Sequence, residues 1–379
     1  MTYSKIKQMT YVLCAALFAL AMIFPAHAQL DLGINAESAV LVEQSTGRVL
    51  YQQAPDEKLP PASVTKIMTM LLVCEAIQSG KVSLDDEVIT SAHAASMGGS
   101  QVFLEEGERM TVRDLFKAVA VASGNDAAVA LGEHISGTEE AFVAKMNSRA
   151  RELGMQNTHF ENCNGLDAPG HVTSAADIAI MSRELLKHSM VTEYTGIWMD
   201  TLRGGEFGIS NTNRLIRFYK GANGLKTGST GNAKYCISAS ALRDGMQLIA
   251  VVMGSPTSDD RFTAAKKLMD YGFSNYTLAE VTPERINPIE VRSGTQTTAE
   301  LYCAPFKTLV PKGSEDKITQ QIELAEHTKA PVEAGQKVGV VRYYLGEEEI
   351  GSCDILTLQA VERISIWGIF TKMLAKFSF

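Results

Sequence analysis

The sequence has few of the features that mark metal-binding, disulfide-stabilised or nucleic-acid-binding proteins. Its 379 residues include 6 cysteines, none of them in a C-x-x-C pair, and 7 histidines, so we expect no metal site, no cofactor and no disulfide framework. Positive charge is also scarce, because 35 lysines and arginines face 43 acidic residues and leave a net charge of −8. An acidic chain binds phosphate backbones poorly, so nucleic acid is not an expected partner.

Long apolar runs are missing except near the N-terminus. Residues 1–28 have the order of an export signal: two lysines, an apolar run over 11–24, and the small-x-small tripeptide at 26–28. We predict cleavage before Gln29; the apolar run is short for a bilayer span, and an uncleaved anchor is the alternative. Cleavage removes Cys14 and leaves an odd number of cysteines, most of which we expect to be small buried residues.

The remaining chain has the composition of a globular protein, with 45% hydrophobic and 21% charged residues. Residues 38–44 and 49–53 read as a first hairpin, and residues 235–242 and 247–254 read as a second one. Helical segments lie between the hairpins, and another helix follows them over 259–271. We therefore predict an α+β fold, in which an antiparallel sheet made of N- and C-terminal strands is flanked by helices.

The chain changes character near residue 282. Residues 29–281 form the predicted first domain, and residues 282–356 contain short strands between Gly and Pro turns, which predicts a small all-β domain without a reactive cluster. Residues 357–379 place apolar side chains at three- and four-residue steps beside basic ones, which predicts an amphipathic helix on a membrane surface. A helix docked on its own protein is the alternative.

Three short polar clusters stand out in the first domain. Ser63 and Lys66 are three residues apart at a predicted helix start, so their side chains share a face, and a neutral lysine can activate a serine nucleophile. Ser123-Gly124-Asn125 lies at a predicted corner between helices, and Lys226-Thr227-Gly228 lies in a glycine-rich segment at the start of the second hairpin. Each cluster alone is weak, because Ser63 and Asn125 could simply cap helices.

Together and in this order, the clusters resemble the active-site signatures of the serine penicillin-binding proteins and β-lactamases. The Gly165-Leu166-Asp167 loop, the β domain and the terminal helix resemble the low-molecular-mass D-alanyl-D-alanine carboxypeptidases over essentially the whole mature chain. The resemblance implies a β-lactamase/transpeptidase-like first domain. It also implies a peptidase that removes the terminal D-alanine from peptidoglycan stem pentapeptides through an acyl-serine, that β-lactams inhibit, and that works at the outer face of the bacterial cytoplasmic membrane.

The resemblance also implies a role for the residues of the first two clusters. Ser63 attacks the peptide carbonyl, Lys66 takes its proton, and Ser123 relays a proton to the leaving amine. Asn125 binds an amide of the substrate. The backbone N–H groups of Ser63 and Ser229 hold the oxyanion.

The third cluster is implied to supply positive charge. Lys226 adds positive potential and lowers the pKa of Lys66. Thr227, together with Arg261, receives the substrate's free carboxylate. For Arg261 the alternative is a surface ion pair with Asp259 or Asp260.

One position departs from the pattern, and three other functions compete. Some relatives have a histidine where this chain has Asn164, which puts a deacylating role of that side chain in doubt, and His171 reads as an ordinary loop histidine. A β-lactamase needs Glu-x-x-Leu-Asn in this loop, which residues 161–165 lack. An endopeptidase would use the same residues, and a silent peptidoglycan-binding scaffold would have lost Ser63 or Lys66, which are both present.

Overall fold

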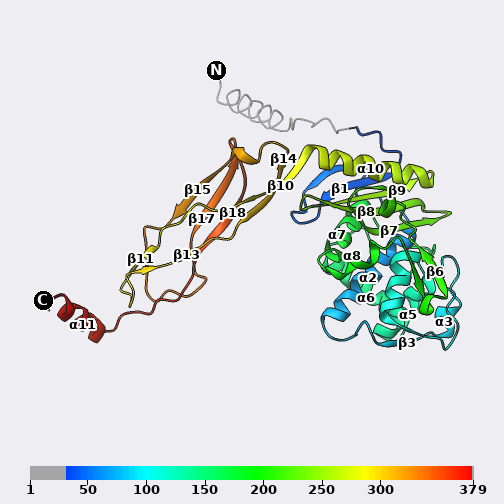
Figure 1. The fold of residues 1–379 in the computed structure, drawn as a ribbon, viewed down its shortest axis with the longest axis horizontal. Coiled ribbons are helices and arrows are strands. Elements are labelled where there is room, and N and C mark those ends of the chain that lie inside the picture. Colours follow the sequence, from blue (N-terminus) through cyan, green and yellow to red (C-terminus); the bar gives the residue numbers. More distant parts are fainter. Residues whose placement is uncertain (1–30, 378–379) are drawn as a thin grey trace, which may run out of the picture. The chain divides into compact units, whose positions relative to one another are not determined.

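The structure is a computed structural model that describes residues 31–377, with side chains as far as Thr371. The predicted signal peptide, residues 1–28, lies outside the described residues. The elements from β1 to α10 are called the N-terminal domain below, and those from β10 to β18 the β domain (Figure 1).

The N-terminal domain is built on one antiparallel sheet of five strands. In spatial order these are β2 (Val49–Gln53), β1 (Ser38–Glu43), β9 (Met246–Ser255), β8 (Lys234–Arg243) and β7 (Ala222–Thr230). The first and last strands of the domain are therefore neighbours at its centre. The predicted hairpins and the α+β fold are confirmed.

The glycine-rich segment is a strand and not the start of one. Our prediction placed Gly224 to Gly231 ahead of the second hairpin, but most of it forms β7, the edge strand next to β8. The prediction failed because glycine weakens a strand pattern in sequence. Here the missing side chain is needed: a Cβ on Gly228 would lie 2.9 Å from the carbonyl oxygen of Pro61 and 2.9 Å from the nitrogen of Ser63.

Helices cover both faces of this sheet. Helix α10 (Ser258–Asn275) lies on one face, and α7 (Ala175–Leu185) and α2 (Lys66–Gln78) lie on the other (Figure 1). Further helical segments surround α2; they are η1 (Ala62–Thr65), α3 (Ala92–Ala95), α4 (Val112–Lys117), η2 (Ala118–Ala122), α5 (Asn125–Ser136), α6 (Glu139–Glu152), α8 (Met190–Thr195) and α9 (Leu215–Phe218). This arrangement buries α2 on most sides, as predicted.

The helix starts follow local capping chemistry. The side chains of Thr111, Thr138, Ser174 and Thr257 each accept a hydrogen bond from a backbone N–H in the first turn of the helix that follows. Two small hairpins complete the domain, formed by β3 (Glu87–Ile89) with β4 (Arg109–Thr111) and by β5 (Met199–Leu202) with β6 (Phe207–Ser210).

The predicted all-β character of the β domain is confirmed, and its strands form three sheets. Strand β10 (Tyr276–Val281) pairs with β14 (Phe306–Pro311), and β11 (Ile289–Arg292) lies between β12 (Thr298–Ala299) and β16 (His327–Lys329). The largest sheet has the order β13 (Leu301–Tyr302), β18 (Glu348–Thr357), β17 (Lys337–Leu345) and β15 (Ile318–Leu324).

The C-terminal helix is shorter than the sequence pattern indicated. We predicted a helix from Thr357, but α11 covers Ile366–Phe377. Thr357 is the last residue of β18, and Val361 is buried in the β domain, where it pairs with Val332. Residues 357–364 therefore do not form a helical face: Val361 packs in the β domain, and Leu358 is exposed. Among the described residues, no helix has the length and apolar character needed to cross a membrane.

Candidate active site

Ser63 and Lys66 lie side by side where the chain enters α2. Ser63 belongs to the short 3-10 turn η1, and Lys66 is the first residue of α2. Lys66 Nζ lies 3.0 Å from Ser63 Oγ. The shared face that the three-residue spacing predicts is therefore present, and the distance allows proton transfer between the two groups.

Two carbonyl oxygens orient the amine of Lys66. Its Nζ lies 2.5 Å from Asn125 Oδ1 and 2.6 Å from the backbone oxygen of Asn164. The orientation of the Asn125 amide is fixed, because its Nδ2 donates to the backbone oxygen of Gly98. Both neighbours can only accept, so a neutral Lys66 gives them its two N–H groups and turns its lone pair towards the Ser63 hydroxyl.

Burial prepares Lys66 to act as a base. The side chain is fully buried, and desolvation lowers the pKa of Lys66 from 10.5 to about 7, although Cys163 and Asp126 oppose the shift. Burial is also the main reason why the pKa of Lys226 lies well below its usual value, followed by the charges of Lys66 and Arg261. The positive charge of Lys66 therefore favours the neutral form of Lys226.

The corner at Ser123 has a strained backbone. The turn η2 before it is a π-helix, and Ser123 adopts a left-handed conformation with φ 65°. Gly124 then leads into α5, whose first residue is Asn125. Both Ser123 and Asn125 are buried. Non-glycine residues with positive φ are uncommon and cluster at functional sites.

Strand β7 carries the third cluster. Lys226 and Thr227 are buried, and Ser229 is exposed. Lys226 Nζ donates to the backbone oxygen of Thr227 at 3.0 Å, and Thr227 Oγ1 donates to Thr212 Oγ1 at 2.7 Å. The close approach of Gly228 to Ser63 brings this strand against η1. Because η1 carries the candidate nucleophile Ser63, it is called the nucleophile turn below.

Arg261 does not form the surface ion pair that we considered. Its guanidinium is buried and donates to the backbone oxygens of Gly228 at 2.9 Å and Cys236 at 3.3 Å. Desolvation lowers the pKa of Arg261 to about 10. Asp259 instead pairs with Arg214 at 2.5 Å. Arg261 therefore supplies a buried positive charge directly behind β7.

The loop that precedes α7 presses on the nucleophile turn. Gly165 has φ +89°, and a Cβ there would lie 2.0 Å from the backbone oxygen of Ala62. Asp167 of the same loop accepts a hydrogen bond from Thr230 Oγ1 at 2.7 Å. The loop thus contacts both the turn that carries Ser63 and the edge strand β7.

His171 is a structural link that the sequence did not reveal. Its ring is buried, Nδ1 accepts from the N–H of Glu161 at 2.9 Å, and Nε2 lies 2.8 Å from Thr65 Oγ1. Nδ1 must be unprotonated to accept, so Nε2 carries the hydrogen and donates to Thr65. Burial lowers the pKa of His171 to about 4, which keeps the ring neutral. The sequence shows His171 only among turn residues and does not indicate this contact with Thr65, the last residue of η1.

The cysteines within residues 31–377 are free thiols, and most of them are buried as predicted. Cys74, Cys163 and Cys236 are buried, whereas Cys303 and Cys353 are partly exposed. Among the described residues, no group of His, Cys, Asp and Glu side chains could hold a metal ion.

Comparison with known proteins places both parts of the chain. Residues 25–257 match the family model described as D-alanyl-D-alanine carboxypeptidase. The chain belongs to the D-alanyl-D-alanine carboxypeptidase family. Residues 281–363 match the model for the C-terminal domain of penicillin-binding protein 5. The fold and the serine peptidase class that the sequence predicts are confirmed.

Individual carboxypeptidases and solved structures agree with this family. D-alanyl-D-alanine carboxypeptidase DacF of Bacillus subtilis is 47% identical over 82% of both chains, and DacC of Escherichia coli is 33% identical over 88% of this chain and 86% of the relative. The structure of penicillin-binding protein 5 from Haemophilus influenzae has a TM-score of 0.78 and 32% identity, and the match covers 87% of this chain and 98% of that one. Penicillin-binding protein D2 of Listeria monocytogenes, solved in its ampicillin-bound form, has a TM-score of 0.60 and 33% identity, with 64% of this chain and all of that one covered.

Proposed function

We propose that this chain removes the terminal D-alanine from peptidoglycan stem pentapeptides, with Ser63 as nucleophile and Lys66 as general base. The observation that carries the proposal is the buried amine of Lys66, which two carbonyl oxygens orient towards Ser63 Oγ at 3.0 Å. Serine hydroxyls become nucleophilic when such a base accepts their proton. A pKa of Lys66 near 7 makes a large fraction of this base available at neutral pH.

The acylation step follows from these contacts. Ser63 Oγ bonds to the carbonyl carbon between the two terminal D-alanines, and its proton passes to Lys66. The negative charge on the carbonyl oxygen is stabilised by the N–H groups of Ser63 and Ser229. Ser123 carries a proton to the leaving amine, the C–N bond breaks, and free D-alanine departs. Water then attacks the acyl carbon, Lys66 accepts a proton from the water and passes it to Ser63 Oγ, and the C–Oγ bond breaks to release the shortened peptide.

The buried cations select the substrate. Lys226 Nζ donates to the backbone oxygen of Thr227, and the Arg261 guanidinium donates to the backbone oxygen of Gly228, so both basic groups add positive potential at this end of β7. The free carboxylate of the terminal D-alanine is the group that this potential attracts, with the Thr227 hydroxyl as its hydrogen-bond partner. Asn125 is held by Lys66 and Gly98, and it binds the substrate amide with the N–H that remains.

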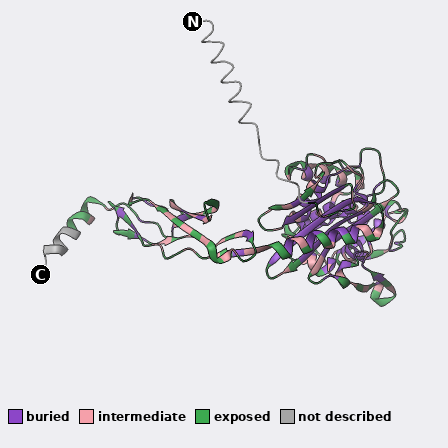
Figure 2. Ribbon diagram, turned by 90° about the horizontal axis from the view of Figure 1, so that it is seen from above, coloured by how far each residue is buried: buried purple, intermediate pink, exposed green. Residues whose placement is uncertain are grey.

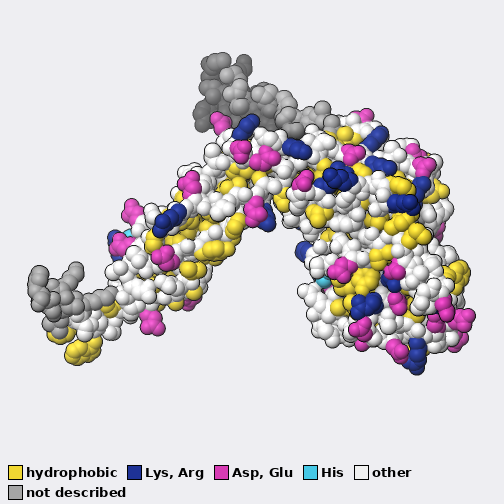
Figure 3. Space-filling model, viewed as in Figure 1, with side chains coloured by type: hydrophobic (Ala, Val, Ile, Leu, Met, Phe, Trp, Pro, Cys, Tyr) yellow, Lys and Arg dark blue, Asp and Glu magenta, His cyan; other side chains and the backbone are white. Residues whose placement is uncertain are grey.

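The terminal helix supports attachment to a membrane surface. The chain acts outside the cytoplasm, where peptidoglycan lies, and α11 exposes Ile366, Trp367, Ile369 and Phe370 (Figure 3). An amphipathic helix with an aromatic residue and basic neighbours partitions into the interface of a bilayer. We propose that α11 holds the enzyme at the outer face of the cytoplasmic membrane.

The test of the catalytic proposal uses substrate and inhibitor in parallel. Mass spectrometry of a stem pentapeptide incubated with the enzyme should show the loss of one alanine, and a labelled penicillin should map to Ser63. Ser63→Ala and Lys66→Ala should both abolish labelling while the protein stays folded by circular dichroism. Cleavage of cross-linked peptides without loss of alanine would instead identify an endopeptidase. Labelling of another residue would refute the assignment of Ser63.

A further inference from the structure

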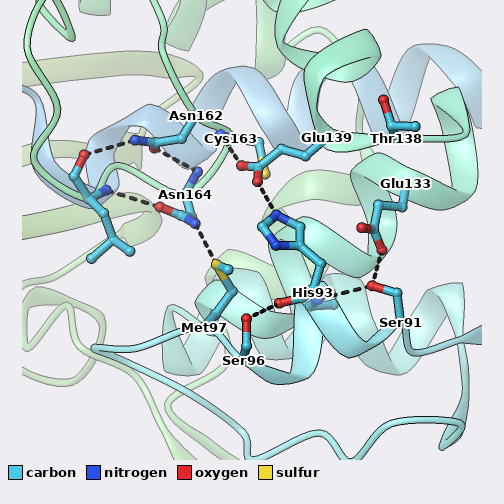
Figure 4. A network of polar contacts seen from close by, with 12 residues as sticks. Ser91, His93, Ser96, Met97, Glu133, Thr138, Glu139, Asn162, Cys163 and Asn164 are labelled. Carbon is cyan, nitrogen blue, oxygen red and sulfur yellow. Dashed lines mark hydrogen bonds and ion pairs between the residues drawn. The ribbon is translucent and has the colours of Figure 1, made fainter.

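A carboxylate outside the three catalytic clusters holds the loop that orients Lys66. Glu139 is the first residue of α6, directly after the cap residue Thr138. Its Oε1 accepts from the backbone N–H of Cys163 at 3.0 Å, and its Oε2 lies 2.7 Å from His93 Nε2 (Figure 4). The side chain is only 12% exposed. Each carboxylate oxygen of Glu139 thus has a hydrogen-bond partner, one in α3 and the other in the loop.

The residue that Glu139 binds leads directly to the base. Cys163 is followed by Asn164, whose backbone oxygen lies 2.6 Å from Lys66 Nζ. The carbonyl of Cys163 accepts from Thr69 Oγ1 on α2, also at 2.6 Å. This stretch has no regular secondary structure, so its backbone groups depend on side chains for hydrogen bonds. Glu139 fixes the N–H side of the segment, and α2 fixes the carbonyl side.

Side-chain contacts within the loop do not replace this anchor. Asn162 accepts from the N–H of Gly165 at 2.7 Å, and Asn164 Oδ1 accepts from the N–H of Leu166 at 3.0 Å (Figure 4). These two bonds shape the turn without attaching it to another element, and the bond from Asn164 Nδ2 to Met97 Sδ, at 3.5 Å, uses a weak thioether acceptor (Figure 4). Glu139 reaches the segment from α6, on a helix whose position is set by the core, since Phe142 and Met146 are buried.

We propose that Glu139 is a positioning residue for Lys66, which acts by holding the Cys163–Asn164 backbone so that the Asn164 carbonyl remains on the amine. The inference rests on the proposed role of Lys66 as the base. Without this carbonyl, one N–H of the neutral amine loses its acceptor, and the lone pair is no longer restricted to the direction of Ser63.

His93 restrains the carboxylate from the outer side. Its side chain is 49% exposed, and its hydrogen bond to Glu139 is the main cause that raises the pKa of His93. Glu133 and Glu140 add to this effect. Cys163 from the loop and Asp126 from α5 raise the pKa of Lys66, and Lys66 in turn lowers the pKa of Lys226 on β7.

The loss of Glu139 should change the pH profile in a defined direction. Removing the carboxylate releases a carbonyl that stabilises the ammonium form of Lys66, and the loss of this acceptor lowers the pKa of Lys66. In a plot of the acylation rate constant against pH, the ascending limb should therefore move to lower pH. The plateau should fall at the same time, because the neutral amine is no longer aimed at Ser63.

The experiment compares rate constants for acylation by a labelled penicillin across the pH range in which Lys66 titrates. Glu139→Ala should lower the plateau on the order of tenfold and shift the limb to lower pH. Glu139→Gln keeps an acceptor for the N–H of Cys163 and should recover most of the plateau. Glu140→Ala, which removes the exposed carboxylate next in the chain, should match the unmodified enzyme.

The outcomes separate this inference from the proposed function. If the unmodified enzyme is not acylated at Ser63, the proposed function fails. If it is acylated and Glu139→Ala has the same limb and plateau, the positioning role is refuted even when the variant melts at a lower temperature, because the rates are compared at a temperature at which both proteins are folded. Failure of Glu139→Gln to recover the plateau also contradicts it.

Discussion

The central strands of the N-terminal domain are buried on both faces, whereas strands of the β domain are exposed on alternate residues. Strand β9 is buried at nearly every position, and β15 alternates between partly buried and exposed side chains. Figure 2 shows the five-stranded sheet of the N-terminal domain as mostly buried, whereas the strands of the β domain mix buried, intermediate and exposed residues. The β domain has two small clusters of buried residues, one around Val291 and Val361 and the other around Val341, Tyr343 and Ile355.

This difference decides where acyl chemistry is possible. Helices on both faces of a sheet create a volume without water, in which desolvation can shift the pKa of a lysine by several units. Among the described residues, the buried Lys, Arg, Asp and Glu side chains all lie in the N-terminal domain. The thin β domain buries apolar groups for its own stability and provides no comparable environment.

The largest effect should come from a methyl group added where the loop meets the nucleophile turn. In Gly165→Ala the new Cβ would lie 2.0 Å from the Ala62 oxygen, at φ +89°, so the loop must move away from Ser63. A displacement of about 1 Å can reduce catalysis on the order of a hundredfold. We expect at least this loss in the rate of penicillin acylation.

A glycine of the β domain provides the matched control. Gly313 has φ +81°, but a Cβ there meets nothing within 4 Å. Gly313→Ala should therefore cost only about 1 kcal/mol of stability from the strained backbone and leave acylation unchanged. Equal acylation rates for the two variants would show that the loop does not support the nucleophile turn.

A second, smaller effect concerns the two buried lysines. Our hypothesis is that the ammonium group of Lys226 disfavours that of Lys66, so in Lys226→Ala the pKa of Lys66 should rise and the ascending limb of acylation should move to higher pH. Burial is the main cause of the low pKa of Lys66, so the shift should be only part of the difference between about 7 and 10.5. The measurement is the rate of penicillin acylation against pH.

A surface lysine of the β domain serves as the control. Lys337 pairs with Asp354 at 2.6 Å, and both side chains are more than half exposed. Lys337→Ala should leave the profile unchanged, because exposed pairs have little influence at a distance. An unaltered limb in Lys226→Ala would contradict the coupling between the buried lysines.

The sequence predicts the contacts that follow from short spacing, but not those that depend on folding. Ser63 and Lys66 share a face because they are three positions apart in a helical turn. Asn164, Glu139 and His171 reach the same site from separate elements, and the Asn164 contact uses a backbone oxygen that no residue type reveals. Periodicity also assigned Val361 to a helix, because a buried extended segment can place apolar residues at the same steps.

Truncation should separate attachment from catalysis. A chain that ends after Ser365 lacks α11 but keeps Thr357 and Val361 in the β domain. It should leave the membrane pellet and keep its rates of acylation and D-alanine release, since every proposed catalytic residue precedes Thr263. Co-sedimentation with lipid vesicles and penicillin labelling measure the two properties.

Removing nine more residues, so that the chain ends after Leu356, tests the corrected helix boundary. Ending the chain after Leu356 also removes Thr357, whose Oγ1 donates to the Glu333 oxygen at 2.5 Å, and the buried Val361. The β domain should then lose roughly 2 to 3 kcal/mol of stability from the valine side chain alone, while acylation persists. Persistent pelleting of the chain that ends after Ser365 would refute the role of α11 as the anchor.

The smallest effect should distinguish buried hydroxyl groups in the two domains. The ring of Tyr343 stacks on Phe306 with centroids 4.4 Å apart, and its hydroxyl is buried without a hydrogen-bond partner among residues 31–377. Tyr343→Phe keeps the stacked ring and removes an unsatisfied polar group, so the β domain should be unchanged or more stable by up to about 1 kcal/mol. In the N-terminal domain the Tyr219 hydroxyl donates to Asp270 at 2.7 Å, so Tyr219→Phe should cost about 1 to 2 kcal/mol. Urea denaturation of the two variants measures both changes, and a loss of stability in Tyr343→Phe as large as that in Tyr219→Phe would show that the β-domain hydroxyl has a partner in solution.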